Sequence, residues 1–170
     1  MRAERLQPAQ LSRELREGRS PDLTRRRWTI GLSFAGVLIG AVVGAYQAGI
    51  VRRLPDIAPG KIFDAEKVDA SDYAYQRLQM PDAMLMIITY GVTAALASAG
   101  GKDRAGQNPA LPIAAAAKAA YDFVTCLRLA REEWQENRAF CSWCQAATLI
   151  SAATLALSLP EARKAAANIV

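Results

Sequence analysis

The sequence predicts an all-α, polytopic membrane protein: a bundle of four transmembrane helices with a large extracytoplasmic loop between the first two. Charged residues make up 22% of the 170-residue chain, which is near the proportion in soluble proteins. They are segregated, because three long segments carry no charge: 28–51, 83–101 and 139–160. Each of these is long enough to cross about 30 Å of hydrocarbon as a helix. A fourth apolar segment is interrupted by Lys118 and Asp122, and we interpret it as a span too.

Taken in order, the predicted spans cover about 28–51, 82–101, 109–128 and 139–160. The first begins too far from Met1, and is too long, to be a cleaved signal peptide. Four glycines recur along it at intervals of four or five residues: Gly31, Gly36, Gly40 and Gly44. Small residues at such spacing let helices approach closely, which favours a tightly packed bundle.

The segments around the spans complete the domain organisation. Residues 1–27 form an Arg-rich arm, in which the pattern after Pro8 predicts a short helix. Residues 28–160 form the transmembrane domain, and residues 161–170 a short tail. The connection between the first two spans is about 30 residues long, and loops of that length usually carry function. Segment 63–77 of that loop predicts a short helix along the membrane surface, with its aromatic side chains at headgroup level: Phe63, Tyr73 and Tyr75.

The basic residues predict the orientation of the bundle. The arm, the connection between the second and third spans, and the tail carry twelve Lys and Arg residues, against eight on the opposite side. The positive-inside rule therefore places both termini in the cytoplasm. The net charge of +5 needs no nucleic-acid partner, because orientation and attraction to anionic membrane lipids account for it.

A Cys-x-x-Cys pair, Cys141 and Cys144, opens the last span. Residues three apart share one helix face, so the two sulfurs can form a disulfide, and the first turn of a helix stabilises a thiolate. We expect Cys141 to be the exposed nucleophile and Cys144 to lie a turn deeper in the bundle. A pair of inert structural thiols is the alternative that the motif leaves open.

Metal and haem interpretations of the pair are excluded by composition. The chain has no histidine and one further cysteine, Cys126, so no complete Cys/His zinc site can form within it. Haem attachment would need a histidine where Gln145 stands. A dithiol at the outer edge of a membrane bundle can instead exchange electrons with a soluble thiol on one side and with a lipid-soluble quinone on the other.

Several segments resemble the vitamin K epoxide reductase family in its small bacterial form. They are "FDAEKVDASDYA" in the loop, "MPDAMLMIITY" at the second span and "FCSWCQAATLISAATLAL" at the fourth. The resemblance covers roughly residues 28 to 160. It implies a four-helix bundle that holds a quinone, ubiquinone or menaquinone, beside the Cys-x-x-Cys pair. It also implies a thioredoxin-like exported partner that delivers electrons, usually through a second cysteine pair in the outer loop.

The resemblance assigns roles to individual residues. Cys141 would exchange with the incoming thiol, and Cys144 would face the quinone. Ser71 matches a loop serine that positions the loop over the quinone, and Tyr90 matches a tyrosine of the second span. Further pocket neighbours are expected on weaker grounds: Phe63, Trp143 and Thr148. For Tyr90 and Trp143, structural roles as an interface aromatic and a packed core residue are alternatives of equal weight to a role in the pocket.

The chain also departs from the family pattern. Ala65 stands where the family has a loop cysteine, and no cysteine lies between residues 1 and 125. The internal thiol relay therefore cannot operate. Cys126 is interpreted as a buried bystander that could approach the site. Lys118 and Asp122, four residues apart, are interpreted as an intrahelical ion pair facing the bundle.

Two functions follow from these observations. The first is a thiol–disulfide oxidoreductase of a bacterial inner membrane, passing electrons from a thioredoxin-like partner through Cys141 and Cys144 to a quinone. The second is a catalytically inactive accessory subunit of a larger respiratory or photosynthetic membrane complex. The missing relay and the small-residue helix faces favour the second function.

Overall fold

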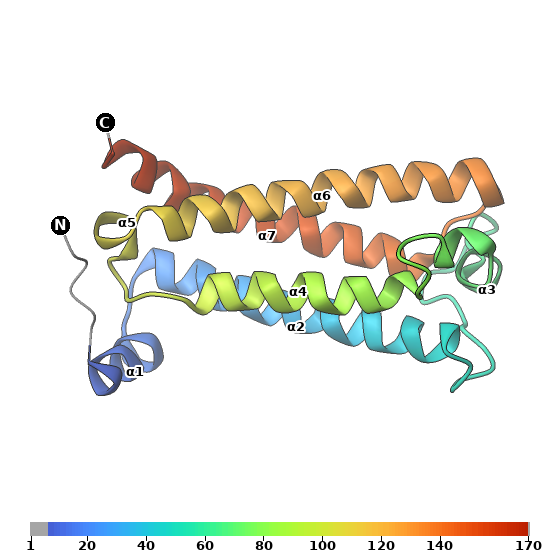
Figure 1. The fold of residues 1–170 in the computed structure, drawn as a ribbon, viewed down its shortest axis with the longest axis horizontal. Coiled ribbons are helices and arrows are strands. Elements are labelled where there is room, and N and C mark those ends of the chain that lie inside the picture. Colours follow the sequence, from blue (N-terminus) through green and yellow to red (C-terminus); the bar gives the residue numbers. More distant parts are fainter. Residues whose placement is uncertain (1–6, 170) are drawn as a thin grey trace.

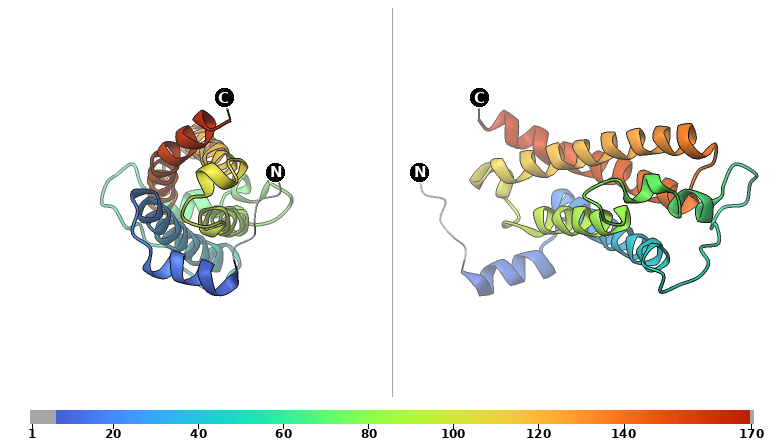
Figure 2. Two further views of the ribbon diagram at one scale, coloured as in Figure 1. Left: turned by 90° about the vertical axis from the view of Figure 1, so that its left-hand side faces the viewer. Right: turned by 45° about the vertical axis from the view of Figure 1, so that its right-hand side comes forward.

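A computed structural model describes residues 7–169 and confirms the all-α class. Four long helices lie side by side: α2 (Pro21–Gln47), α4 (Asp82–Ser98), α6 (Ala110–Asn137) and α7 (Ser142–Ala167). They form a ring in which α2 packs on α4, α4 on α6, α6 on α7, and α7 on α2. The end-on view in Figure 2 shows this arrangement. Within the described residues the only extended pairing is an isolated bridge between Phe63 and Phe140.

Three of the four helices, α2, α6 and α7, are long and apolar enough to cross a membrane. Helix α4 is apolar but has 17 residues, which corresponds to about 26 Å. The outer surface of the bundle carries large exposed hydrophobic side chains: Trp28, Phe34, Leu38, Ile88, Tyr121, Val124 and Leu149. This surface suits a multi-pass membrane protein, and that α4 also spans the membrane stays a prediction.

Small residues set the close packing of α2 on α4. A Cβ atom added at Gly36 would lie 2.5 Å from the ring of Tyr90, and one at Gly40 would lie 2.9 Å from Ile87. The glycines predicted to let helices approach closely therefore do so at these two positions. Gly31, by contrast, has open space in front of it.

Helices α2, α6 and α7 extend beyond the predicted spans, whereas α4 ends at Ser98, short of the predicted boundary at 101. Helix α2 begins at Pro21, where Ser20 caps it by accepting a hydrogen bond from Leu23 N at 3.1 Å, so the Arg triplet of the arm belongs to this helix. Helix α7 continues through Pro160 to Ala167 instead of ending at the proline. The apolar segments mark the part of a helix that hydrocarbon could surround. The helical backbone continues past that part wherever its polar side chains find hydrogen-bond or ion-pair partners.

The two ends of the bundle are built differently (Figure 1). At one end lie α1 (Pro8–Glu17), which is the short helix predicted for the arm, and α5 (Arg104–Gln107). At the other end the connection between α2 and α4 folds back over the bundle, with α3 (Ala65–Asp69) and the 3-10 helix η1 (Asp72–Tyr75). The single helix predicted for 63–77 is therefore two short helices. Tyr73 is buried at 6% exposure, so its expected place at headgroup level was wrong.

Candidate functional site

The two cysteines of the Cys-x-x-Cys pair meet at the N-terminus of α7. Cys141 is the N-cap residue, and its sulfur accepts a hydrogen bond from the backbone N–H of Cys144 at 3.3 Å. Cys141 is fully buried at 0% exposure, while Cys144 is half-buried. The expectation that Cys141 is the exposed partner was therefore wrong. Cys141 faces the folded-back connection, and Cys144 faces the bundle interior.

A short backbone pairing holds the connection over Cys141. Phe140 N donates to Ile62 O at 2.8 Å, and Asp64 N donates to Phe140 O at 3.0 Å. Phe63, expected near a quinone, is the bridge residue of this pairing and contributes through its backbone. The pairing fixes the segment that leads into α3 directly beside the dithiol.

Asp56 and Trp143 fasten the same connection to α7. Asp56 Oδ1 accepts from the hydroxyl of Ser142 at 2.6 Å, and Asp56 Oδ2 accepts from Ala65 N at 2.9 Å. The indole N–H of Trp143 donates to Pro55 O at 2.9 Å. Trp143 therefore anchors the loop and packs against the buried cluster around Cys141, which matches its interpretation as a packed residue.

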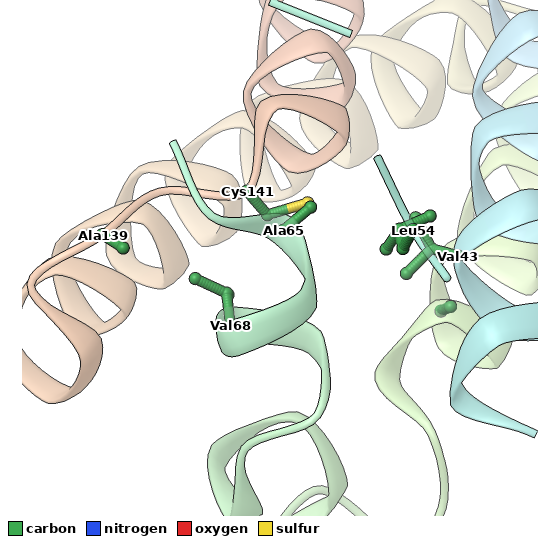
Figure 3. Close-up of a cluster of buried hydrophobic side chains, with 7 residues drawn as sticks. Val43, Leu54, Ala65, Val68, Ala139 and Cys141 are labelled. Carbon is green, nitrogen blue, oxygen red and sulfur yellow. The ribbon is translucent and has the colours of Figure 1, made fainter. Parts of the chain in front are cut away.

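A small apolar cluster covers the sulfur of Cys141 (Figure 3). Its buried members come from four parts of the chain: Val43, Leu54, Ala65, Val68, Ala83, Ala139 and Cys141. Ala65 is 0% exposed and shares this cluster with Cys141. The position that matches the family's loop cysteine is therefore placed against the dithiol, although it carries only a methyl group here.

Two buried carboxyl groups flank the dithiol, and sequence reasoning missed both. Asp69 at the end of α3 is 1% exposed, and Glu133 on α6 is 3% exposed. A carboxylate oxygen of Asp69 and the two sulfurs all lie within 4.8 Å of one another. Glu133 Oε2 accepts from Cys141 N at 3.4 Å and from Gln145 Nε2 at 3.1 Å, and so orients the start of α7.

Burial changes the acidity of Asp69. Loss of solvent raises the pKa of this carboxyl from 3.8 to about 7, and the negative charges of Asp82 and Asp56 act in the same direction. The nearby Cys141 thiol opposes the increase in pKa. Near neutral pH, Asp69 is therefore poised to accept or release a proton beside the sulfurs.

A cavity of about 300 Å³ lies between α4, α6 and α7, beneath η1. Cys144 lines it, as do two of the residues expected near a quinone, Tyr90 and Thr148. The lining also includes residues that sequence reasoning did not select: Tyr73, Arg77, Asp82, Tyr121 and Glu133. Ser71, Phe63 and Trp143 do not line the cavity, so the structure separates them from the other expected neighbours.

Ser71 contributes to the shape of the loop. Its hydroxyl donates to Val68 O at 2.6 Å in the turn between α3 and η1. That turn brings Tyr73 to the cavity, where the phenol donates to Leu129 O at 3.1 Å. The guanidinium of Arg77 lies 4.8 Å above the Tyr73 ring. Ser71 is thus one turn away from the residues that cover the cavity.

The deeper part of the cavity is polar. The hydroxyl of Tyr90 donates to Ala147 O at 2.6 Å and lies 3.0 Å from Ser151 Oγ. Cys126 also lines the cavity, with its sulfur 3.5 Å from Ser151 Oγ, so it approaches the site. Lys118 and Asp122 form the predicted intrahelical ion pair, and Asp122 faces the cavity.

The cavity has the size and lining of a small-molecule site, whereas the dithiol lacks the ligands of a closed structural zinc site. Apolar side chains with a few polar groups are the usual lining of a cofactor pocket, and the volume suits one substituted ring. Asp69, Cys141 and Cys144 offer three ligand atoms, one fewer than a closed structural zinc site uses. The structure therefore brings the two sulfurs together with one acidic neighbour.

Comparison with known proteins gave one match. The family model described as the vitamin K epoxide reductase family matches residues 27–159. No curated protein and no solved structure matches the chain. The matched segment contains both cysteines of the pair, the folded-back connection and every residue that lines the cavity.

Proposed function

Because the chain belongs to the vitamin K epoxide reductase family, we propose that it is a membrane thiol–disulfide oxidoreductase that passes electrons from an exported thioredoxin-like dithiol to a quinone. The observation that carries this proposal is the position of Cys144. Its side chain lies in the wall of a cavity large enough for a quinone ring, while its partner Cys141 faces the connection outside that cavity. In this proposal Cys144 is the sulfur beside the quinone, and Cys141 is the sulfur that the thiol partner attacks.

The proposed reaction has two half-reactions, one at each cysteine of the pair. A thiolate of the partner protein attacks Cys141 of the oxidised pair, and a second partner thiol then releases the reduced dithiol. Oxidation of that dithiol transfers two electrons and two protons to a ubiquinone or menaquinone beside Cys144. Tyr90 and Thr148 line the quinone cavity, and Ser71, Phe63 and Trp143 position the loop that closes over it.

Because the loop cysteines are missing, this mechanism requires a direct reaction between the partner protein and the pair. With Ala65 in the family's loop-cysteine position, the partner must reach Cys141 directly. Cys141 is covered by the connection, so exchange requires release of the contacts that Asp56 and Trp143 make across it. Binding of the partner protein would supply the energy for that opening.

The proposed topology has four spans, with both termini in the cytoplasm and the dithiol on the outer side of a bacterial inner membrane. The charge distribution supports this orientation, because the end with α1 and α5 carries the excess of basic residues. Helix α4 is then the shortest span. Its 17 residues reach the lower limit for crossing hydrocarbon.

The full burial of Cys141 favours one alternative, an accessory subunit of a larger membrane complex. A buried dithiol without a relay could act as a structural pair, and the exposed apolar faces of the bundle could pack against other subunits. Purification in mild detergent separates the two functions. A stoichiometric complex without quinone turnover would support the accessory role.

Quinone reduction by the purified protein tests the proposed function. The protein is reconstituted in nanodiscs with a short-chain ubiquinone, and a reduced thioredoxin-like protein or dithiothreitol supplies electrons while ultraviolet absorbance reports hydroquinone. We expect turnover that Cys144→Ser abolishes. The control is Thr24→Ser, an equally small change at an exposed position at the opposite end of the bundle, which leaves both the pair and the cavity intact. Wild-type protein that turns over no quinone with either reductant would overturn the proposal.

Restoring a loop cysteine tests the position of Ala65. In a Cys144→Ser background, we expect Ala65→Cys to form a disulfide with Cys141 on mild oxidation, because both residues belong to one buried cluster. Thiol counting and mass spectrometry of the tryptic peptides detect the bond. The control is Ala70→Cys, an exposed position on the same loop, which should stay reduced.

A further inference from the structure

We propose that Asp69 exchanges the proton of the Cys141 thiol each time the Cys141–Cys144 pair is oxidised or reduced. This inference rests on the proposed function, because it assigns the acid–base group of that reaction. Nothing in the family match or in the sequence motif singles out this carboxyl group. It emerges from the fold, which brings the end of α3 against the start of α7.

Proximity is the first argument. One carboxylate oxygen of Asp69 and both sulfurs lie within 4.8 Å of one another, and Asp69 and Cys141 are 1% and 0% exposed. Solvent is therefore excluded from the place where the S–H bond must break. A buried thiol needs a nearby group to take its proton, and Asp69 is within reach on the side of Cys141 that faces α3.

The incomplete hydrogen bonding of Asp69 is the second argument. Within the described residues its Oδ2 atom has no hydrogen-bond partner, and its Oδ1 atom has one long contact, 3.4 Å from Gln47 Nε2. The other acidic groups nearby are engaged. Asp56 accepts from Ser142 and Ala65, and Glu133 accepts from Cys141 N and Gln145. A buried carboxyl group with a single long hydrogen bond is unfavourable for folding, which suggests a role in chemistry.

The proton balance of the oxidation step is as follows. The S–H bonds of Cys141 and Cys144 break, one S–S bond forms, and the quinone becomes hydroquinone by gaining two electrons and two protons. Asp69 accepts the proton of Cys141 as its sulfur bonds to Cys144, and the Cys144 thiol supplies the other proton. Asp69 then loses its proton to solvent when the connection over Cys141 opens for the partner protein, and the second hydroquinone oxygen takes a proton from solvent, so that the overall step balances. In the reduction step, the proton of the first attacking partner thiol goes to Cys144, and Asp69 passes the proton of the second partner thiol to the Cys141 sulfur as that sulfur leaves.

The charges around Asp69 make its pH dependence predictable. The neighbouring elements present acidic or neutral ionisable groups to it: Tyr46 on α2, Asp56 in the connection, Asp82 on α4, Glu133 on α6, and the two cysteines of the pair. The carboxylates disfavour a further negative charge. Burial together with these groups brings the pKa of Asp69 to about 7, where a carboxyl group works as both acid and base.

The test compares Asp69→Asn with Asp64→Asn in full-length protein in nanodiscs. Asp64 is exposed and caps α3 by accepting from Lys67 N at 3.0 Å, a role that asparagine also fulfils. The reduced pair is oxidised once by a short-chain ubiquinone at pH values from about 5.5 to 9. In wild type and in Asp64→Asn the rate should rise with pH through about 7. Asp69→Asn should lose that step and react about 100-fold more slowly above it.

A second measurement separates this inference from the proposed function. Alkylation of the reduced pair by a small neutral reagent follows thiol deprotonation and needs no quinone. If wild type fails to react with quinone, the proposed function fails, and the alkylation profile decides the role of Asp69 alone. Asp69→Glu, which keeps a carboxyl group, should recover part of the rate and the pH step. Identical pH profiles for wild type and Asp69→Asn in both assays would overturn the inference. Chelator is present throughout, so that bound metal cannot imitate the effect.

Discussion

The two ends of the bundle both bury ionisable side chains, yet they satisfy them in opposite ways. At the arginine end, defined by Arg26, Arg104 and Glu161, each charged group is paired or hydrogen-bonded. At the dithiol end, defined by Cys141, Asp69 and Glu133, two carboxyl groups are buried beside sulfur. The comparison distinguishes buried charges that stabilise the fold, at the arginine end, from the carboxyl group of Asp69, which does not.

The arginine end is a closed hydrogen-bond network. Arg104 and Glu161 form a two-point ion pair, with Nε–Oε1 at 2.9 Å and Nη2–Oε2 at 2.7 Å, and their side chains are 3% and 5% exposed. The guanidinium of Arg26 donates to the carbonyl oxygens of all five residues from 97 to 101, at the end of α4. A helix C-terminus leaves such carbonyls without partners, so Arg26 closes α4 and fastens it to α2.

At the dithiol end the buried carboxyl groups have fewer hydrogen-bond and ion-pair partners. Glu133 accepts hydrogen bonds from Cys141 N and Gln145, but Asp69 has one long contact with Gln47. Arg77, the basic side chain nearest the cavity, pairs with Glu132 at 2.7 Å and does not reach Asp69. The difference teaches that burial alone does not define a structural charge. The number and quality of its partners do.

The largest effect is expected from Glu161→Gln at the arginine end. The substitution leaves the buried charge of Arg104 without its counter-ion, and breaking a buried pair destabilises a protein by about 3–5 kcal/mol. Thermal unfolding of the protein in detergent at neutral pH measures the loss. The matched control is Glu136→Gln on the exposed surface of α6, which should change stability by less than about 0.5 kcal/mol. Equal stability of both variants would show that the network does not hold this end.

The same carboxyl-to-amide change should act in the opposite direction at the dithiol end. In the unfolded chain Asp69 titrates near 3.8, and in the folded protein its pKa is about 7, because burial disfavours the charged form. The folded state therefore binds the proton more tightly, and wild-type stability falls as pH rises from about 4 through about 7. Asp69→Asn removes that decline and should be more stable than wild type at pH 8, by on the order of 2–4 kcal/mol. Unfolding midpoints at pH 5 and pH 8 give the comparison, and a decrease at pH 8 would contradict it.

Much of the fold follows from the distribution of charge along the sequence. The charge-free segments overlap most of α2, α4 and α7. The pair Lys118–Asp122 faces the bundle, and the glycines of α2 lie against α4 at Gly36 and Gly40. These features depend on contacts along one helix or on hydrophobicity, which a sequence displays directly. The helix ends could not be predicted in this way, because Pro21 and Ala167 lie in polar segments whose partners come from elsewhere in the chain.

The site was predicted less completely, for a physical reason. Cys144, Tyr90 and Thr148 meet in one cavity because they lie at helical spacing on neighbouring spans. Asp69 and Glu133 stand in charged segments that resemble solvent-exposed surface, and only the folding of the connection onto α7 buries them. The same fold explains why Cys141 is covered. Such long-range packing leaves no periodic signal in the sequence.

The smallest effect is expected at the rim of the arginine end, where Asp22 pairs with Arg25 and with Lys164, the latter at 2.7 Å. The lysine side chain is 55% exposed, and exposed ion pairs contribute about 0–1 kcal/mol. Asp22→Asn should therefore destabilise the protein by less than about 1 kcal/mol, and high salt should remove the difference because mobile ions screen exposed charges. The effect of Glu161→Gln should persist in high salt, because its partner is shielded from solvent. Unfolding midpoints of both variants at low and high ionic strength make the measurement. If high salt changed the effects of Asp22→Asn and Glu161→Gln equally, the buried ion pair would be accessible to ions. It would then not differ from the exposed pair of Asp22 and Lys164.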